Sequence, residues 1–197
     1  MKIRKILNNN LVLASDVQGN EIIVKGRGIG FNKKRWDLLD ESVIEKIFTP
    51  ENSKNSKELQ SYLTSIPEDY LDFVQEYVDD IKNSYDIKLN NSIYISLSDH
   101  LTGTIKRFNE GISINNLLLL DIKQLYKLEY KIGLDMLEKL NAKFNVNLPL
   151  DEAGFIALHF VNAQDSEGKN DGFKISHIVN EIMEIVKRYY DSIVFDE

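Results

Sequence analysis

The sequence predicts a β + α multidomain protein, in which a small antiparallel β-sheet domain is followed by an all-α helical bundle. Short alternating runs of polar and apolar residues fill the first 50 residues, whereas after about residue 65 the apolar residues recur at three- and four-residue spacing. The composition, with 43% apolar and 28% charged residues, is that of a globular chain and not of a disordered one.

Four short strands are expected in the first part of the chain. Asn8-Asn9-Asn10 and a segment around Gly19 are turn signals, and the runs between them alternate or are rich in β-branched residues. A sheet this small buries little apolar surface, so we expect it to pair with a second copy of itself. The predicted strands are residues 2–7, 11–15, 21–25 and 43–48.

Helices are expected in the rest of the chain. Pro50 and its Asn- and Ser-rich neighbours mark a linker over 49–57, and Pro67 and Pro149 stand where two helices begin. Gly133 marks a close contact between helices. The predicted helices are residues 65–85, 91–108, 115–144, one opened by Pro149, and 173–195 after a second linker at 166–172.

Charge is divided unevenly along the chain. Residues 1–35 hold eight basic and two acidic side chains, a net charge of +6, whereas the remaining 162 residues have a net charge of −13. A basic head on an acidic body hints at nucleic-acid binding. A solvated, lysine-rich terminus explains the same charges equally well at this point.

Several classes of protein are excluded by what the sequence lacks. It has no run of about 18 apolar residues that could span a membrane, and Met1–Lys5 leads into a polar segment where a signal peptide would be apolar. It has no cysteine and only three histidines, so a cytoplasmic protein without disulfides, metal or cofactor is expected.

The glycine-rich run Gly26-Arg27-Gly28-Ile29-Gly30-Phe31 combines donors, a cation and an aromatic ring. Its spacing is not that of a dinucleotide fingerprint. Glycines permit close approach of a polyanion backbone, and an aromatic ring or guanidinium can stack on unpaired bases of RNA. The amides of the triple-asparagine turn could read base edges. A glycine-rich turn with a core phenylalanine is the structural alternative, with about equal weight.

Four segments together resemble one known family. Residues 2–10 (KIRKILNNN) and 26–34 (GRGIGFNKK) resemble the RNA-binding module of bacterial transcriptional antiterminators of the BglG/SacY type. Residues 93–100 (IYISLSDH) and 151–159 (DEAGFIALH) resemble the two histidine motifs of that family's first sugar-phosphotransferase system (PTS) regulation domain.

The resemblance implies a domain organisation. Residues 1–55 correspond to the co-antiterminator RNA-binding domain and residues 56–168 to the first PTS regulation domain, a helical bundle. Residues 173–197 resemble only the first helix of a second regulation domain, most of which the chain lacks.

The resemblance also implies a function. The small β domain binds an RNA hairpin in a leader transcript as a homodimer and prevents formation of an overlapping terminator. Basic side chains would offset phosphate charge, and the aromatic ring would stack in an internal loop of the hairpin. The implied RNA-binding residues are Lys5, Asn8, Asn9, Asn10, Gly26, Arg27, Gly28, Phe31, Lys33 and Lys34.

His100 and His159 are the implied phosphorylation sites. The resemblance makes them acceptors of a phosphoryl group from the phosphocarrier protein and a sugar-specific enzyme II, so that sugar availability controls RNA binding. Judged by the residues alone, a histidine on an apolar helix face is more often a hydrogen-bonded core residue.

The main alternative is a phosphohistidine-regulated interaction module whose basic β head binds a partner other than RNA. An enzyme is not expected. Asp151 and Glu152 have a sufficient explanation as acidic residues at a helix start, and no nucleophile, phosphate-binding loop or metal motif is present. No catalytic, cofactor-binding or metal-binding residue is therefore predicted.

Overall fold

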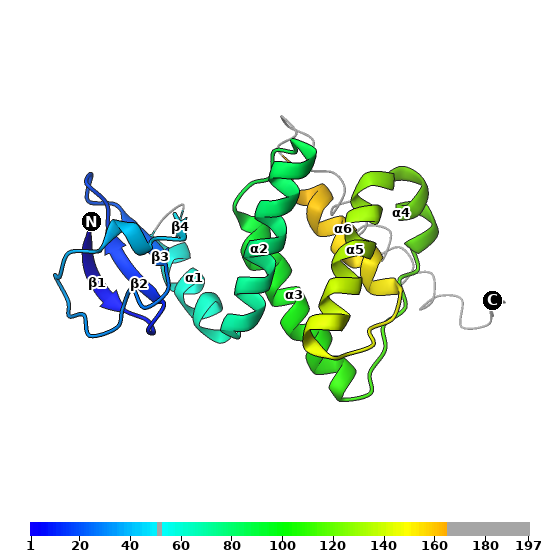
Figure 1. Ribbon diagram of the computed structural model, residues 1–197, viewed down its shortest axis with the longest axis horizontal. Coiled ribbons are helices and arrows are strands. Elements are labelled where there is room, and N and C mark those ends of the chain that lie inside the picture. Colours follow the sequence, from blue (N-terminus) through cyan, green and yellow to red (C-terminus); the bar gives the residue numbers. More distant parts are fainter. Residues whose placement is uncertain (51–52, 165–197) are drawn as a thin grey trace. The chain divides into compact units, whose positions relative to one another are not determined.

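The computed structural model describes residues 1–50 and 53–164 (Figure 1). The chain forms two compact units, the first spanning Met1–Leu71 and the second beginning at Asp72. The predicted second linker and the predicted helix over 173–195, with the third domain of which it is part, lie outside the described residues. None of the described helices has the length and apolar character needed to cross a membrane.

The first unit contains a four-stranded antiparallel sheet, as the sequence predicts. Its strands follow one another in space in the order β1-β2-β3-β4, each paired with its neighbour in the chain. The last strand is shorter than predicted, because a short 3-10 helix, Glu41–Val43, takes up the start of that segment. The strands are β1 Lys2–Ile6, β2 Leu11–Ser15, β3 Glu21–Lys25 and β4 Lys46–Phe48.

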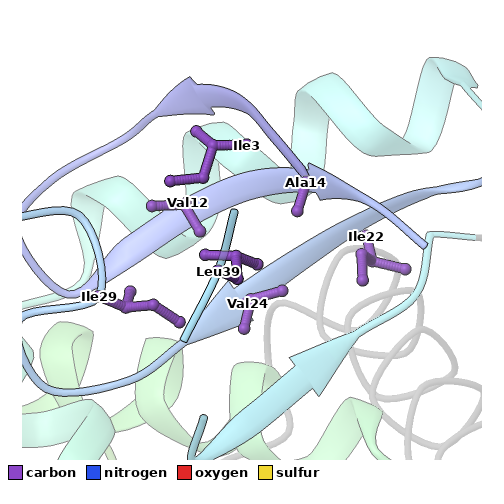
Figure 2. Packing of buried hydrophobic residues seen from close by; sticks show 7 residues of the cluster. All are labelled: Ile3, Val12, Ala14, Ile22, Val24, Ile29 and Leu39. Atoms are coloured by element: carbon purple, nitrogen blue, oxygen red, sulfur yellow. The ribbon is translucent and has the colours of Figure 1, made fainter. Parts of the chain in front are cut away.

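One face of the sheet carries a hydrophobic core. Ile3 lies opposite Ala14, and Ala14 lies opposite Ile22, so alternate residues of three strands point to the same side. Figure 2 shows these side chains with two from the loop that follows β3. The buried cluster comprises Ile3, Val12, Ala14, Ile22, Val24, Ile29 and Leu39.

The outer edge of β1 is covered by the chain itself. The pairing of β1 with β2 shifts between Ile3 and Lys5, where a bulge or irregularity interrupts the register. On the other side of β1, the Ile3 amide donates to the Asp37 carbonyl at 3.0 Å, and the Trp36 amide donates to the Ile3 carbonyl at 2.7 Å. The segment around Trp36 is therefore fixed along this edge, where an open strand would otherwise expose unpaired backbone groups.

A helix occupies part of the predicted linker at 49–57, which is a correction. Helix α1, Ser53–Ser65, packs on β3. Its sequence is so polar that only Leu59, Tyr62 and Leu63 offer apolar contacts, and the composition therefore resembles that of a linker. Leu63 is almost completely buried. Tertiary packing therefore stabilises a helix that the local spacing of apolar residues does not predict.

The remaining helices agree with the sequence pattern except at one place. The predicted helix over 115–144 is broken at Tyr126, whose backbone leaves the helical region at φ −121° and ψ 56°. The apolar spacing continues across the break without proline or glycine, so the pattern could not reveal it. The helices are α2 Glu68–Tyr85, α3 Ser92–Asn109, α4 Leu119–Leu125, α5 Lys127–Phe144 and α6 Asp151–Ala163.

Helix α6 is the centre of the second unit, because it packs against α3, α4 and α5. Gly133 on α5 makes the close contact that the sequence predicts. A Cβ atom at this position would lie 2.2 Å from the Ala153 carbonyl oxygen on α6. The absence of a side chain at Gly133 therefore sets the distance between the two helices.

Candidate functional sites

The triple-asparagine turn and the glycine-rich loop lie side by side in the first unit. The Gly28 amide donates to the Asn10 side-chain oxygen at 2.5 Å, and the Gly30 amide donates to the Asn9 carbonyl at 2.9 Å. A third bond joins the Gly26 amide to the Asn10 carbonyl at 3.0 Å. Two segments that are well separated in the sequence thus form one surface.

The three glycines of the loop have different roles. At Gly26 and Gly30 the chain itself approaches, because an added Cβ would lie 2.0 Å from the Val43 carbonyl oxygen and 2.5 Å from that of Asn8. Gly28 instead has φ +69° and open space around its Cα. The close approach expected for a bound polyanion is therefore possible at Gly28, whereas the other two glycines serve internal packing.

Arg27 and Phe31 point outward. Phe31 is 59% exposed, and the residue between them that fills the core is Ile29, which is 2% exposed. The Phe31 amide donates to the Gly28 carbonyl at 2.9 Å, so the ring stands at the end of a tight turn. The alternative of a glycine-rich turn with a core phenylalanine is wrong, because Ile29 takes that place.

The other predicted residues of the first unit divide into two groups. Lys33 and Lys34 follow Phe31 in the same loop, and Asn8 caps its own turn by accepting from the Asn10 amide at 2.8 Å. Lys5 instead lines a cleft of about 560 Å³ with residues of β2 and α1, among them Leu13 and Ser61.

A carboxylate also contacts this surface. The Asn10 side-chain amide donates to Glu68, the first residue of α2. The contact is exposed to solvent, and it occupies the Asn10 amide group that is predicted to contact the edges of RNA bases.

His100 and His159 come together in the second unit, which their separation in the sequence did not predict. His100 lies on α3 and His159 on α6, and their ring centroids are 5.0 Å apart. Nε2 of His100 lies 3.0 Å from Oε2 of Glu152, and Nδ1 of His159 lies 3.3 Å from Oγ of Ser96. Each ring thus bridges the two helices.

Glu152 connects His100 to further polar groups. Its side chain is buried, and Oε2 also accepts from Thr104 Oγ1 at 3.1 Å. Arg107 donates to the same threonine oxygen at 2.9 Å. A buried carboxylate is stable only with such partners, so this network fixes the position of α6 against α3 around the imidazole.

The two rings also interact electrostatically. Burial, followed by the positive charge that His100 can carry, lowers the pKa of His159 to about 3. His159 is therefore neutral at physiological pH. A neutral imidazole can act as a nucleophile toward phosphorus, whereas a protonated one cannot.

Glu152 and Ser96 are the residues that sequence reasoning missed, since Glu152 was interpreted only as an acidic residue at a helix start. One signal was available. Glu152 precedes His159 by seven residues, which is two helical turns, so the two side chains share a face of α6. Asp99, the acidic neighbour of His100 in sequence, is exposed instead.

Within residues 1–50 and 53–164, no cluster of histidine and acidic side chains could hold a metal ion.

Comparison with known proteins identifies both units. Residues 1–57 match the family model of the CAT RNA binding domain, and residues 75–163 match that of the PRD domain. The chain is 43% identical over its whole length to the transcription antiterminator LicT of Bacillus subtilis (strain 168), of which it covers 71%. It is 42% identical to the beta-glucoside operon antiterminator of Dickeya chrysanthemi, with 95% of this chain and 66% of that protein covered.

A solved structure also matches. The crystal structure of GlcT CAT-PRDI superimposes with a TM-score of 0.70 at 34% identity, covering 84% of this chain and 98% of that chain. The matched 84% of the chain includes residues of both units.

Proposed function

Because this chain belongs to the family of transcription antiterminators that join a CAT RNA-binding domain to a PRD domain, we propose that it binds an RNA hairpin in a leader transcript as a homodimer and prevents formation of the overlapping terminator. In this proposal residues 1–55 bind RNA, and residues 56–168 regulate that binding in the cytoplasm.

The observation that carries the proposal is the outward position of Arg27 and Phe31. Ile29 anchors the loop in the core, and the Asn10 side chain holds the Gly28 amide, so the two functional side chains stand on a fixed support. A guanidinium and an aromatic ring on one rigid loop suit unpaired bases flanked by phosphates, which is the chemistry of an RNA internal loop.

The charge of the first unit supports a polyanionic partner. Residues 1–35 have a net charge of +6, and a dimer doubles this charge over one RNA hairpin. Lys33 and Lys34 follow Phe31 directly, where they would contact phosphates on either side of the stacked base. Asn8, Asn9 and Asn10 would contact base edges or the backbone from the adjoining turn.

Regulation is proposed to act through His100 and His159. The phosphocarrier protein and a sugar-specific enzyme II of the PTS would donate the phosphoryl groups. Each phosphoryl group adds about two negative charges at a contact between α3 and α6, beside the buried Glu152 carboxylate. Phosphorylation would therefore change the packing of the two helices and shift the population of states that bind RNA.

Binding to the leader hairpin tests the proposal. The hairpin preceding the gene is transcribed in vitro, and its affinity is measured by fluorescence anisotropy for the wild type, Arg27→Ala and Phe31→Ala. We expect affinity to fall steeply with salt and to prefer this hairpin over duplex DNA. Each substitution should weaken binding by about tenfold or more, since stacking on an aromatic ring contributes about 1–3 kcal/mol per base.

Equal affinity for the hairpin and for duplex DNA, with no effect of Phe31→Ala, would instead favour the interaction module with a partner other than RNA. Asn32→Gly is a suitable control, because this exposed loop residue neighbours Phe31, carries neither charge nor a ring, and has a backbone φ of +53°, which glycine adopts without strain.

A further inference from the structure

A second cationic site lies on the first unit, outside the residues predicted to bind RNA. The Trp36 ring has two guanidinium groups near it, with Cζ of Arg35 at 4.8 Å and Cζ of Arg4 at 5.1 Å from the ring centroid. Trp36 is 52% exposed. An exposed indole with two guanidinium neighbours is not explained by packing of the core.

The backbone holds this indole in place. Trp36 has φ +78°, in the left-handed region that disfavours a residue with a bulky side chain. The hydrogen bonds of Trp36 and Asp37 to the two backbone groups of Ile3 fix this conformation, because Ile3 is fully buried in β1. A strained, exposed and rigidly held tryptophan indicates a functional surface.

Arg4 is also oriented before any ligand arrives. Its Nε donates to the Ser15 hydroxyl on β2 at 2.6 Å, which leaves the terminal nitrogens of the guanidinium directed away from that bond. Among the described residues, neither Arg4 nor Arg35 forms an ion pair with a carboxylate. The guanidinium groups of Arg4 and Arg35 therefore both contact the Trp36 ring, and neither is neutralised by a carboxylate in the described part of the chain.

The chemistry of this group matches a phosphodiester backbone. A guanidinium presents a planar fork of donors that fits phosphate oxygens, and stacking on an aromatic ring reduces the entropy lost on binding. The segment from Phe31 to Trp36 is continuous and basic, containing Lys33, Lys34 and Arg35, and runs through tight turns such as that from the Asp37 amide to the Lys34 carbonyl at 3.1 Å. One strand of RNA could follow it.

We propose that Arg4, Arg35 and Trp36 form a second RNA contact that binds the phosphate backbone of the hairpin stem, independently of its sequence. This inference rests on the proposed RNA-binding function and extends it beyond the predicted residues. It assigns the surface formed by residues 8–10 and 26–31 to the unpaired bases, and Arg4, Arg35 and Trp36 to the paired stem.

Two RNA probes separate these roles. One is the leader hairpin, and the other is a fully paired RNA duplex of the same length. Arg35→Ala should weaken binding about fivefold on both probes and lower the salt slope by about one, as expected for a phosphate contact. Arg4→Ala should act in the same way, whereas Phe31→Ala should weaken binding to the hairpin alone.

The variants are chosen to keep the fold. Trp36→Gly suits the left-handed backbone at this position, and it should weaken binding to both probes because the two guanidinium groups lose their support. Arg35→Lys keeps the charge and should retain the salt slope. Lys131→Ala, which removes an exposed cation from α5 in the other unit, should leave both affinities unchanged.

The outcomes distinguish this inference from the function on which it rests. Wild-type affinity of Arg4→Ala, Arg35→Ala and Trp36→Gly on both probes, together with a loss in Phe31→Ala, would overturn the second contact and leave the proposed function intact. Failure of the wild type to bind either RNA would overturn both. A loss of self-association at unchanged RNA affinity, measured by sedimentation, would assign the group to a protein contact and overturn the proposal.

Discussion

Nε2 of His100 on α3 lies 3.0 Å from Oε2 of Glu152 on α6, and this carboxylate is 4% exposed. The contact joins a proposed phosphorylation site directly to a buried negative charge. A phosphoryl group on His100 would place like charges side by side where water cannot screen them. In the proposed function, phosphorylation of His100 would therefore change the packing of α3 against α6 at this contact.

A double-mutant cycle tests this coupling. His100→Asp introduces a carboxylate near Glu152 and should lower the free energy of unfolding by about 2 kcal/mol, because a buried charge loses its partner and gains a repulsive neighbour. Glu152→Gln should cost less in the His100→Asp background than in the wild type, or should stabilise that variant. Urea unfolding followed by the helical circular-dichroism signal measures the four free energies.

The neutral variant His100→Asn is the control for loss of the imidazole alone. An interaction free energy near zero in the cycle would show that the two positions do not communicate electrostatically.

The low pKa of His159 predicts a dependence of stability on pH. Its pKa is about 3 in the native state, below the ordinary value of 6.5. Below pH 6.5 the unfolded chain therefore takes up a proton that the native state does not bind. Stability is retained above this pH and is lost as the pH falls toward 3, by up to about 1.4 kcal/mol per pH unit from this one group.

Carboxylates titrate in the lower part of the same range, so the comparison is made with His159→Gln, which cannot take up the proton. Urea unfolding of both proteins at several pH values between 6.5 and 5 isolates the contribution of the histidine. The variant should lose less stability than the wild type over this range. Parallel curves would contradict a lowered pKa.

The β part of the fold could be predicted because turn residues separate short runs that alternate, as around Ile3 in β1, or are rich in β-branched residues, as around Ile22 in β3. The helical part shows where local pattern fails. Helix α1 is polar and depends on the burial of Leu63 against the rest of the unit, and the break at Tyr126 carries no local signal. Both are decided by tertiary packing, which a residue pattern does not contain.

The candidate sites show the same division. The outward position of Arg27 and Phe31 could not be predicted from strand alternation, because residues 27, 29 and 31 would share one face of a strand. The turn from the Phe31 amide to the Gly28 carbonyl sets it, and only the resemblance pointed to the two side chains as RNA contacts. The contact of His100 with Glu152 could not be predicted either, since it joins two helices whose relative position only the folded unit defines.

Gly133 offers a test of the packing between α5 and α6. An alanine there would bring its Cβ to 2.2 Å from the Ala153 carbonyl oxygen. Because this oxygen belongs to the backbone of α6, the clash can be relieved only if one of the two helices moves. Gly133→Ala should therefore lower the free energy of unfolding by about 2–3 kcal/mol, as overpacking of a core does. The measurement is again urea unfolding followed by the helical signal.

Gly103→Ala is the matched control, because this glycine also lies within a helix. A Cβ there meets only the end of the long Arg107 side chain, with one guanidinium nitrogen at 3.2 Å, and no backbone atom of another helix. Its expected effect is a stabilisation of up to about 1 kcal/mol from helix propensity. Similar effects of the two substitutions would mean that the close contact at Gly133 is not what sets the helix separation.

Glu68 is expected to weaken RNA binding. Its carboxylate accepts a hydrogen bond from the Asn10 side-chain amide, so it engages a donor of the proposed RNA surface and adds a negative charge beside it. Glu68→Gln keeps an acceptor for Asn10 and removes the charge, so affinity for the leader hairpin should rise about threefold at low salt, where electrostatic repulsion is least screened. Fluorescence anisotropy at two salt concentrations measures the gain and its decrease with salt.

Asp69→Asn is the matched control, because it removes the same charge from the next residue, which is exposed and is not the acceptor of the Asn10 amide. A gain limited to Glu68→Gln would show that the negative charge beside Asn10 opposes RNA, since general repulsion by the helix start would raise the affinity of both variants equally.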